Sequence, residues 1–319
     1  MLFLRRSRLL IAVLTLSLMM FTTLVPDMAA AASSNSTDPL AAMISRMTLE
    51  EKLGQMFMVD FRQWNGKNVV EINPEIEKVI RQYRPGGVIL FKENVVDIGQ
   101  TVALVDGLQR ASGNIPLLVA IDQEGGLVAR IEYGTVMPGN MALGAIGSTK
   151  DVQLAGEITG QELKALGINA NLAPVVDVNI NPDNPVIGIR SFGSDPDRVG
   201  EMGVAYIKGL DSAGVATAAK HFPGHGDTSV DSHLALPSLP HQLNRLELVE
   251  LKPFQKAIDQ GVDMILSAHV TFPAIDNTKV TSLMDGREIS VPATLSSRVM
   301  TDLLRGQMGF KGVSHYRCP

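Results

Sequence analysis

Residues 215–233 read VATAAKHFPGHGDTSVDSH, in which an apolar run is followed by a segment with one lysine, three histidines and two aspartates. Residues 215–219 are small and apolar, which is typical of a strand buried on both faces of a sheet. Lys220 and His221 follow at once, and His225 and His233 come later in a segment whose proline and glycines forbid a helix. Titratable side chains are costly to bury unpaired, so packing alone does not explain this cluster. The stretch predicts a strand that delivers proton-transfer groups into a loop.

Similar apolar runs, each followed by an amphipathic helical stretch, recur along the chain. They are continuous rather than alternating, which indicates a parallel sheet covered by helices. We therefore expect an α/β fold of the (β/α)8 TIM-barrel type. A doubly wound open sheet is the competing arrangement, but no Gly-x-Gly-x-x-Gly follows the first strand. The predicted strands cover residues 55–61, 88–91, 117–121, 169–173, 215–221 and 264–270, with one more that begins at 311.

The expected helices carry recognisable end signals. Thr48 and Glu51 form a capping box, and Asn73 stands as a cap before Pro74. Glycines that follow a helical stretch close several of the others. The remaining helices are expected over residues 97–111, 148–166, 195–213, 244–260 and 296–307.

Polar residues follow three of the predicted strands. Asp122 comes after the strand at 117–121, Lys220 and His221 end the strand at 215–221, and His269 lies at the end of the strand at 264–270. The active site of a β/α barrel lies at the carboxyl ends of its strands. We therefore expect these groups to meet at one rim, although each alone could be a structural, hydrogen-bonded residue.

The two ends of the chain differ in character from its middle. Basic residues at 5, 6 and 8, an apolar run over 9–25 and small residues at 29–32 predict a secretory signal peptide over 1–32, with a membrane anchor as the alternative. Residues 33–46 resemble a flexible lead-in, and the barrel domain is expected over 47–313. The polar residues 314–319 form an unrelated tail, so we expect a barrel that is incomplete at its C-terminal end.

Composition excludes several classes of function. The net charge of −5 gives no reason to expect a nucleic-acid partner or an acidic membrane surface. Cys318 is the only cysteine, which rules out an intrachain disulfide and a thiolate metal cluster. We expect an exported protein, secreted or associated with the cell wall, without stable membrane insertion after signal cleavage.

Three motifs together resemble glycoside hydrolase family 3. The long string over 220–228 is the most specific, and the Asp-Ser-His that follows it resembles the β-N-acetylglucosaminidase branch. The resemblance runs from about Thr48 to Val313. The motifs are Asp-Gln-Glu-Gly-Gly at 122–126 with Arg130, Ile-Arg-Ser-Phe-Gly at 189–193, and Lys-His-Phe-Pro-Gly-His-Gly-Asp-Thr at 220–228 with Asp-Ser-His at 231–233.

This resemblance implies retaining hydrolysis of terminal β-N-acetylglucosamine, with an amino-sugar oligosaccharide or a muropeptide as the substrate and without a cofactor or a metal. It also implies that His233 is the acid/base and that Asp231 orients it. An imidazole titrates near neutrality, and a carboxylate on its other nitrogen fixes its tautomer. The residues that would contact the substrate are Asp122, Arg130, Arg190, Lys220 and His221. Asp177 is interpreted as bracing the rim.

The chain departs from the family at one place. The family nucleophile is an aspartate shortly after a strand that begins Gly-Phe-Lys-Gly-Val, which stands here at 309–313. Ser314 and His315 follow, and nothing in the sequence gives His315 or Tyr316 a covalent role. Since a glycosyl-enzyme needs that nucleophile, we expect little or no turnover by this chain, which resembles a truncated or frameshifted product.

Three alternatives remain at this point. A non-catalytic glycan-binding protein would keep the sugar contacts without the nucleophile. A metal hydrolase would use His221, His225 and nearby aspartates, but Pro223 and the glycines remove the helical spacing that zinc ligands use. A phosphorolytic enzyme would also use the histidine, and it too needs the nucleophile. The natural substrate and the oligomeric state stay open.

Overall fold

The computed structural model describes residues 38–232, 235–283 and 285–316. The chain divides into two compact units, Met1–Leu49 and Glu50–Pro319. The described part of the first contains helix α2 (Pro39–Arg46), which starts at Pro39 after the Asp38 side chain caps it. This helix lies within residues 33–46, where the sequence indicates a flexible lead-in. The predicted signal peptide, 1–32, lies outside the described residues.

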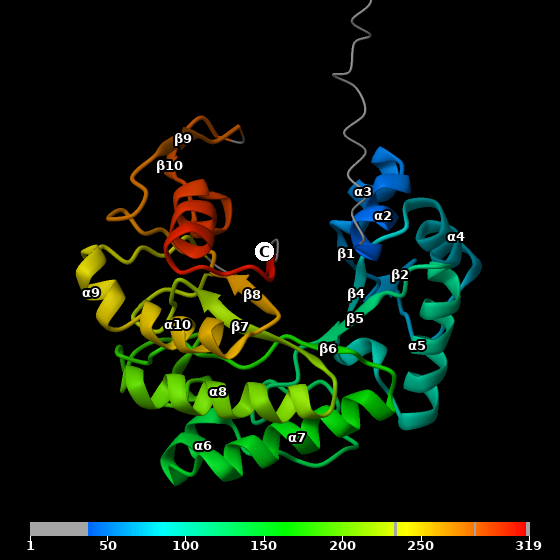
Figure 1. The fold of residues 1–319 in the computed structure, drawn as a ribbon, viewed down its shortest axis with the longest axis horizontal. Helices are drawn as coiled ribbons and strands as arrows, with labels where there is room; N and C mark the ends of the chain where they lie inside the picture. The colour runs from blue at the N-terminus through cyan, green and yellow to red at the C-terminus, as the bar shows by residue number, and fades with distance from the viewer. Residues whose placement is uncertain (1–37, 233–234, 284, 317–319) are drawn as a thin grey trace, which may run out of the picture. The chain divides into compact units, whose positions relative to one another are not determined.

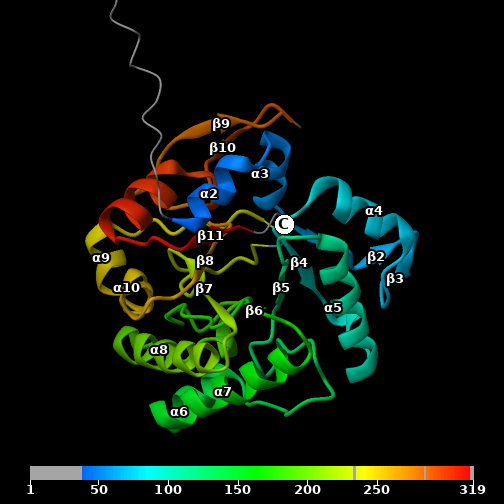
Figure 2. The same cartoon turned by 45° about the vertical axis from the view of Figure 1, so that its right-hand side comes forward.

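The second unit is built on a sheet of seven parallel strands in the order β1-β4-β5-β6-β7-β8-β11. The order follows the chain without reversal, and Figures 1 and 2 show the sheet curling into a half-barrel. The α/β fold and the incomplete barrel are therefore confirmed, and the doubly wound alternative is wrong. The strands are β1 (Met58–Asp60), β4 (Gly87–Leu90), β5 (Leu118–Ile121), β6 (Ala170–Asn171), β7 (Ala216–Phe222), β8 (Met264–Ser267) and β11 (Val313–His315).

Alternate residues of the strands enter two different cores. On the helix-covered face, Val88 and Val119 join the large cluster that packs against the helices. On the inner face, a smaller cluster contains Ile89, Phe91, Leu172 and Met264 together with three alanines at 120, 170 and 218. Both faces of the sheet are buried, which explains why the strands read as continuous apolar runs.

Helices cover the outer face of the curled sheet (Figure 1). Among them, α7 packs on α8, α8 on α10, and α10 on β7. Asn73 caps α4 by accepting the amide of Ile76, with Pro74 at the first helical position, as predicted. The helices are α3 (Leu49–Gln55), α4 (Pro74–Tyr83), α5 (Ile98–Ser112), α6 (Asn140–Ile146), α7 (Thr149–Ala165), α8 (Pro196–Ser212), α9 (Leu243–Leu248), α10 (Leu251–Gln260) and the π-helical segment η4 (Arg298–Gln307).

Two antiparallel pairs stand apart from the main sheet. Strands β2 (Gln63–Trp64) and β3 (Lys67–Asn68) form a hairpin whose turn residues, Asn65 and Gly66, have positive φ. Strands β9 (Lys279–Thr281) and β10 (Glu288–Ser290) pair in the same antiparallel way. None of the helices in the described part of the chain combines the length and the apolar character that crossing a bilayer requires.

Strand β11 is the last strand of the described sheet. It pairs with β8, so that Ser314 lies opposite Ile265 and His315 opposite Leu266. The predicted boundary at 313 therefore falls inside a strand. Among the described residues, β1 and β11 each have one neighbour in the sheet, which leaves the half-barrel open between them.

Candidate functional site

A cavity of about 720 Å³ lies at the carboxyl ends of the strands. Strands β5, β7 and β8 deliver Asp122, Lys220 with His221, and His269 to its wall, and these are the groups that the sequence places at one rim. Arg130 lines the same wall from a loop, and Arg190 does so from the short 3-10 helix η2 (Gly188–Arg190). All five predicted substrate-contact residues are thus brought together, namely Asp122, Arg130, Arg190, Lys220 and His221.

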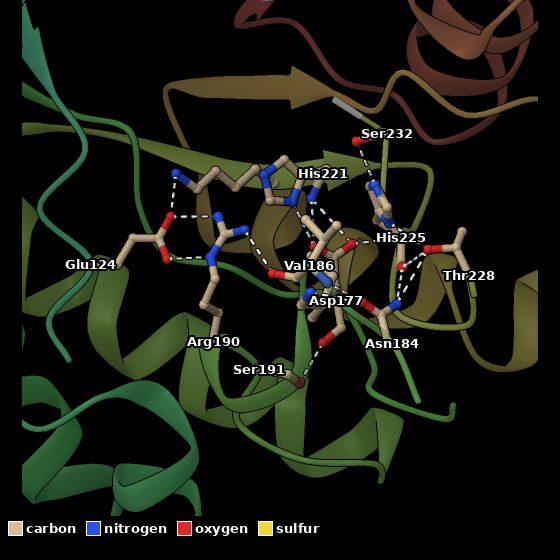
Figure 3. Close-up of polar contacts among 12 residues, drawn as sticks. Glu124, Asp177, Asn184, Val186, Arg190, Ser191, His221, His225, Thr228 and Ser232 are labelled. Carbon is tan, nitrogen blue, oxygen red and sulfur yellow. Dashed lines mark hydrogen bonds and ion pairs between the residues drawn. The ribbon is translucent and has the colours of Figure 1, made fainter. Parts of the chain in front are cut away.

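The centre of the wall is a buried ion network. The ammonium of Lys220, which is 1% exposed, lies 2.7 Å from Oδ1 of Asp122 and 2.6 Å from Oε1 of Glu124. Arg190 binds Glu124 through two bonds, from Nη2 to Oε1 at 2.7 Å and from Nε to Oε2 at 2.9 Å (Figure 3). Such bidentate, charge-assisted pairs fix both side chains in place. Although burial alone would raise the pKa of Glu124, Lys220 and Arg190 hold it below the usual value.

Arg130 is positioned by its backbone. Gln123 Oε1 accepts the amide of Arg130 at 2.7 Å, and the amide of Gln123 itself donates to Asn171 Oδ1 on β6. The Arg130 guanidinium stays 3.7 Å from Oδ2 of Asp122 and 5.9 Å from the centre of the Phe91 ring. It is therefore held at the edge of the ion network, where Arg130 lines the cavity.

A second network orients His221. The carboxylate of Asp177 is fully buried, and it accepts hydrogen bonds from His221 Nδ1 at 2.7 Å and from the amides of His221 and His225 (Figure 3). Ser191 donates to the carbonyl of Asp177 at 2.6 Å. Asp177 thus ties the end of β7 to the segment that follows β6, which is the bracing that the sequence indicates.

The two histidines on this network are held neutral. Burial lowers the pKa of His221 to about 4, with Arg190 and Lys220 acting in the same direction and Asp177 opposing them. Burial also lowers the pKa of His225. A neutral His221 that donates from Nδ1 to Asp177 presents an unprotonated Nε2, a hydrogen-bond acceptor.

His225 anchors the loop that follows β7. Its ring is 2% exposed, and it bonds Thr228 Oγ1 through Nδ1 and Ser232 Oγ through Nε2, both at 2.8 Å (Figure 3). Asn184 adds a bond to the His225 carbonyl at 2.8 Å. Ser232 lines the cavity and Asp231 is half-buried beside it, whereas His233, the predicted acid/base, lies outside the described residues.

Further cavity residues come from β8, from β11 and from the residues that follow these strands. His269 lies beyond β8, and burial lowers its pKa. His315 and Tyr316 line the cavity from β11. Within the described ranges, no group of three or more histidine, cysteine or acidic side chains has the arrangement of a metal site.

Sequence reasoning gave no role to Glu124 or Ser232, and it considered His225 only as a ligand in the metal-hydrolase alternative. Glu124 stands two residues after Asp122 in the quoted motif, and this spacing was the available signal, since alternate residues of an extended segment share a face. His225 and Ser232 lie inside the quoted strings as well. The hydrogen bonds of His225 and Ser232 are made within the loop or to residues distant in the sequence, and neither composition nor periodicity predicts such bonds.

Comparison with known proteins places these features in a family. The glycosyl hydrolase family 3 N terminal domain matches residues 48–314. The β-hexosaminidase A of Pseudoalteromonas piscicida is 43% identical over 289 residues, which are 84% of this chain and 48% of that protein. A solved family 3 β-N-acetylglucosaminidase from a Paenibacillus species is 46% identical, with a TM-score of 0.79 over 85% of this chain and 49% of its own.

A third protein extends the comparison. Native NagZ from Neisseria gonorrhoeae is 32% identical, with a TM-score of 0.72 over 81% of this chain and 71% of its own. The chain spans about half the length of the Pseudoalteromonas and Paenibacillus relatives. The matched region includes every described residue of the cavity except Tyr316 and His315.

Proposed function

Because this chain belongs to glycosyl hydrolase family 3, we propose that it binds β-N-acetylglucosamine at the non-reducing end of an oligosaccharide and serves the retaining hydrolysis of that glycosidic bond. The observation that carries the proposal is the buried network of Asp122, Glu124, Arg190 and Lys220 at the cavity wall. Preorganised charged donors and acceptors at the end of a barrel suit the many hydroxyl groups of a sugar.

Proton transfer is proposed for the loop after β7. His233 would protonate the bridging oxygen and Asp231 would stabilise the charged imidazole, because a carboxylate on the second ring nitrogen fixes the tautomer. Support comes from Ser232, which lies between them in sequence and lines the cavity. His221 is a poor candidate for this role, because its pKa of about 4 keeps it unprotonated near neutrality.

The natural substrate is proposed to be a peptidoglycan-type fragment or another β-N-acetylhexosaminide, met outside the cytoplasm after export. The basic and apolar start of the chain supports export. The resemblance of the Asp-Ser-His motif at 231–233 to the β-N-acetylglucosaminidase branch supports the amino sugar.

Binding and turnover can be tested separately. Calorimetric titration of the purified chain with N-acetylglucosamine is expected to show binding that Arg130→Met weakens, while Arg110→Met, on the exposed face of α5, leaves it unchanged. Release of nitrophenol from a nitrophenyl β-N-acetylglucosaminide then measures hydrolysis. Binding without hydrolysis would favour the glycan-binding alternative, and absence of any binding would overturn the proposal.

A further inference from the structure

His269 lines the cavity but belongs to neither of the two hydrogen-bond networks described above. It follows β8 and lines the cavity together with Leu266 and Ala268. Burial lowers the pKa of His269, and no charged neighbour contributes to this shift. His221 and His225, by contrast, are each fixed by hydrogen bonds to Asp177, Thr228 or Ser232.

The two ring nitrogens of His269 differ in their surroundings. Nδ1 is buried and has no hydrogen-bond partner among the described residues. Nε2 is not among the buried atoms that lack a partner. A proton on Nδ1 would be a buried donor without an acceptor, which costs about 1–3 kcal/mol. The proton is therefore better placed on Nε2, where the cavity can supply an acceptor. Neutral His269 then presents an N–H donor to the cavity.

The class of acceptor follows from the rest of the wall. Asp122, Glu124, Arg190 and Lys220 already form a charge-balanced network, and Leu266 and Ala268 next to His269 are apolar. A neutral N–H in such surroundings suits a neutral oxygen, either the carbonyl of an acetamido group or a ring hydroxyl, more than a carboxylate.

We propose that His269 donates a hydrogen bond from Nε2 to an oxygen of the bound amino sugar and so takes part in substrate recognition. This inference rests on the proposed function, because it needs a sugar in the cavity. It assigns a contact from β8, on the opposite side of β7 from Asp122 and Glu124. The sugar would then be held from two sides of the half-barrel.

Substitution by glutamine and by asparagine distinguishes the roles of the two ring nitrogens of His269. The amide nitrogen of glutamine overlays Nε2 of histidine, and that of asparagine overlays Nδ1. His269→Gln is therefore expected to keep most of the affinity for methyl β-N-acetylglucosaminide, while His269→Asn and His269→Ala lose roughly 3- to 10-fold in Kd, the range of one neutral hydrogen bond. His241→Gln is the control, because His241 pairs with Asp227 outside the cavity lining.

Nitrogen NMR of the imidazole rings reads the tautomer directly. The signal that disappears in His269→Gln is assigned to His269, and it is expected to show a protonated Nε2 and an unprotonated Nδ1, with Nε2 shifting when the sugar is added. Titration with methyl β-glucoside identifies the acceptor. A loss by His269→Asn confined to the N-acetylated ligand indicates the acetamido carbonyl, and a loss with both ligands indicates a hydroxyl.

The outcomes that overturn the inference are distinct from failure of the proposed function. If His269→Asn and His269→Ala bind the sugar as tightly as the wild-type chain, or if the proton is found on Nδ1, the donor role is excluded and the proposed function is not affected. A wild-type chain that binds no N-acetylglucosaminide would overturn the proposed function, and the contact would be excluded with it.

Discussion

Lys220 Nζ lies 2.6 Å from Oε1 of Glu124, with both side chains 2% exposed. A second pair in the same protein, Lys92 and Glu132, has the same separation of 2.6 Å at the surface, with side chains 62% and 64% exposed. The two pairs share chemistry and distance and differ in burial, which makes them a matched test of what burial does to an ion pair.

Replacement of Glu124 by glutamine is expected to destabilise the fold by about 3–5 kcal/mol, because Lys220 and Arg190 would lose their shared counter-charge in a dry site. Glu132→Gln is expected to change the free energy of unfolding by less than about 1 kcal/mol. Urea unfolding at pH 7 measures both. Equal losses of unfolding free energy in the two variants would show that burial does not make the ion pair at the cavity wall more important for stability than the exposed pair.

Stability is expected to fall as the pH is lowered from about 6.5 towards 4, through His221. The pKa of His221 in the folded chain is about 4, below the value of 6.5 for an unperturbed histidine. Between these two pH values the unfolded chain binds the proton and the folded chain does not, so acid stabilises the unfolded state relative to the folded state. The loss is on the order of 3 kcal/mol when the pH reaches the folded pKa. The lowered pKa of His225 also destabilises the fold as the pH falls below 6.5, and the lowered pKa of Asp177 does so only below its usual value of 3.8.

The variant His221→Asn isolates this contribution. The asparagine amide can still donate to Asp177, but it does not titrate, so the dependence of unfolding free energy on pH should flatten between pH 6.5 and 4. Urea midpoints at several pH values give the slopes. An unchanged slope in His221→Asn would assign the acid sensitivity to other groups.

Gly226 is expected to tolerate no side chain. A Cβ there would lie 1.9 Å from the carbonyl oxygen of Val178, so the loop after β7 would have to separate from the segment after β6. Gly226→Ala should therefore unfold at a markedly lower temperature. Gly99→Ala, in α5 with its nearest contact at 3.5 Å, should be neutral or stabilising by up to about 1 kcal/mol. Calorimetric melting compares them, and equal melting temperatures would contradict the close approach.

The link between His225 and Ser232 is expected to matter for stability. Ser232→Ala removes the partner of His225 Nε2 in a ring that is 2% exposed, which should cost about 1–3 kcal/mol. Ser229→Ala, at an exposed position of the same loop, should cost close to nothing. Chemical unfolding of both variants measures the difference, and a silent Ser232→Ala would mean that solvent replaces the hydroxyl.

The inner strands were predictable because they are buried on both faces. Runs such as Val88–Phe91 are apolar at every position, and their order in the sheet follows their order in the chain. Strand ends were less predictable. The expected strand at 169–173 is regular only over Ala170–Asn171, because the chain beyond it turns to pair Val175 with Lys220 and to bring Asp177 under His221.

The site was predictable in part for a related reason. Asp122 and Lys220 stand at strand ends, where barrel topology alone brings them together. The role of Glu124 depends on a partner, Arg190, that lies 66 residues away in the sequence, and a single sequence contains no record of such a pairing. The sequence placed His269 at the predicted rim but left open whether it contacts a ligand or has a structural role. Only the surroundings of its two ring nitrogens in the structure distinguish these two roles.

Ile89 and Leu172 line the cavity from the inner apolar cluster of the sheet, and neither contributes any charge to it. A bulkier apolar residue at one of these positions would make the chamber shallower and leave the ionic wall above it intact. Depth and chemistry are thus specified by different positions of the same sheet. Descendants of such a protein could accordingly alter how far a ligand penetrates while keeping the groups that hold it.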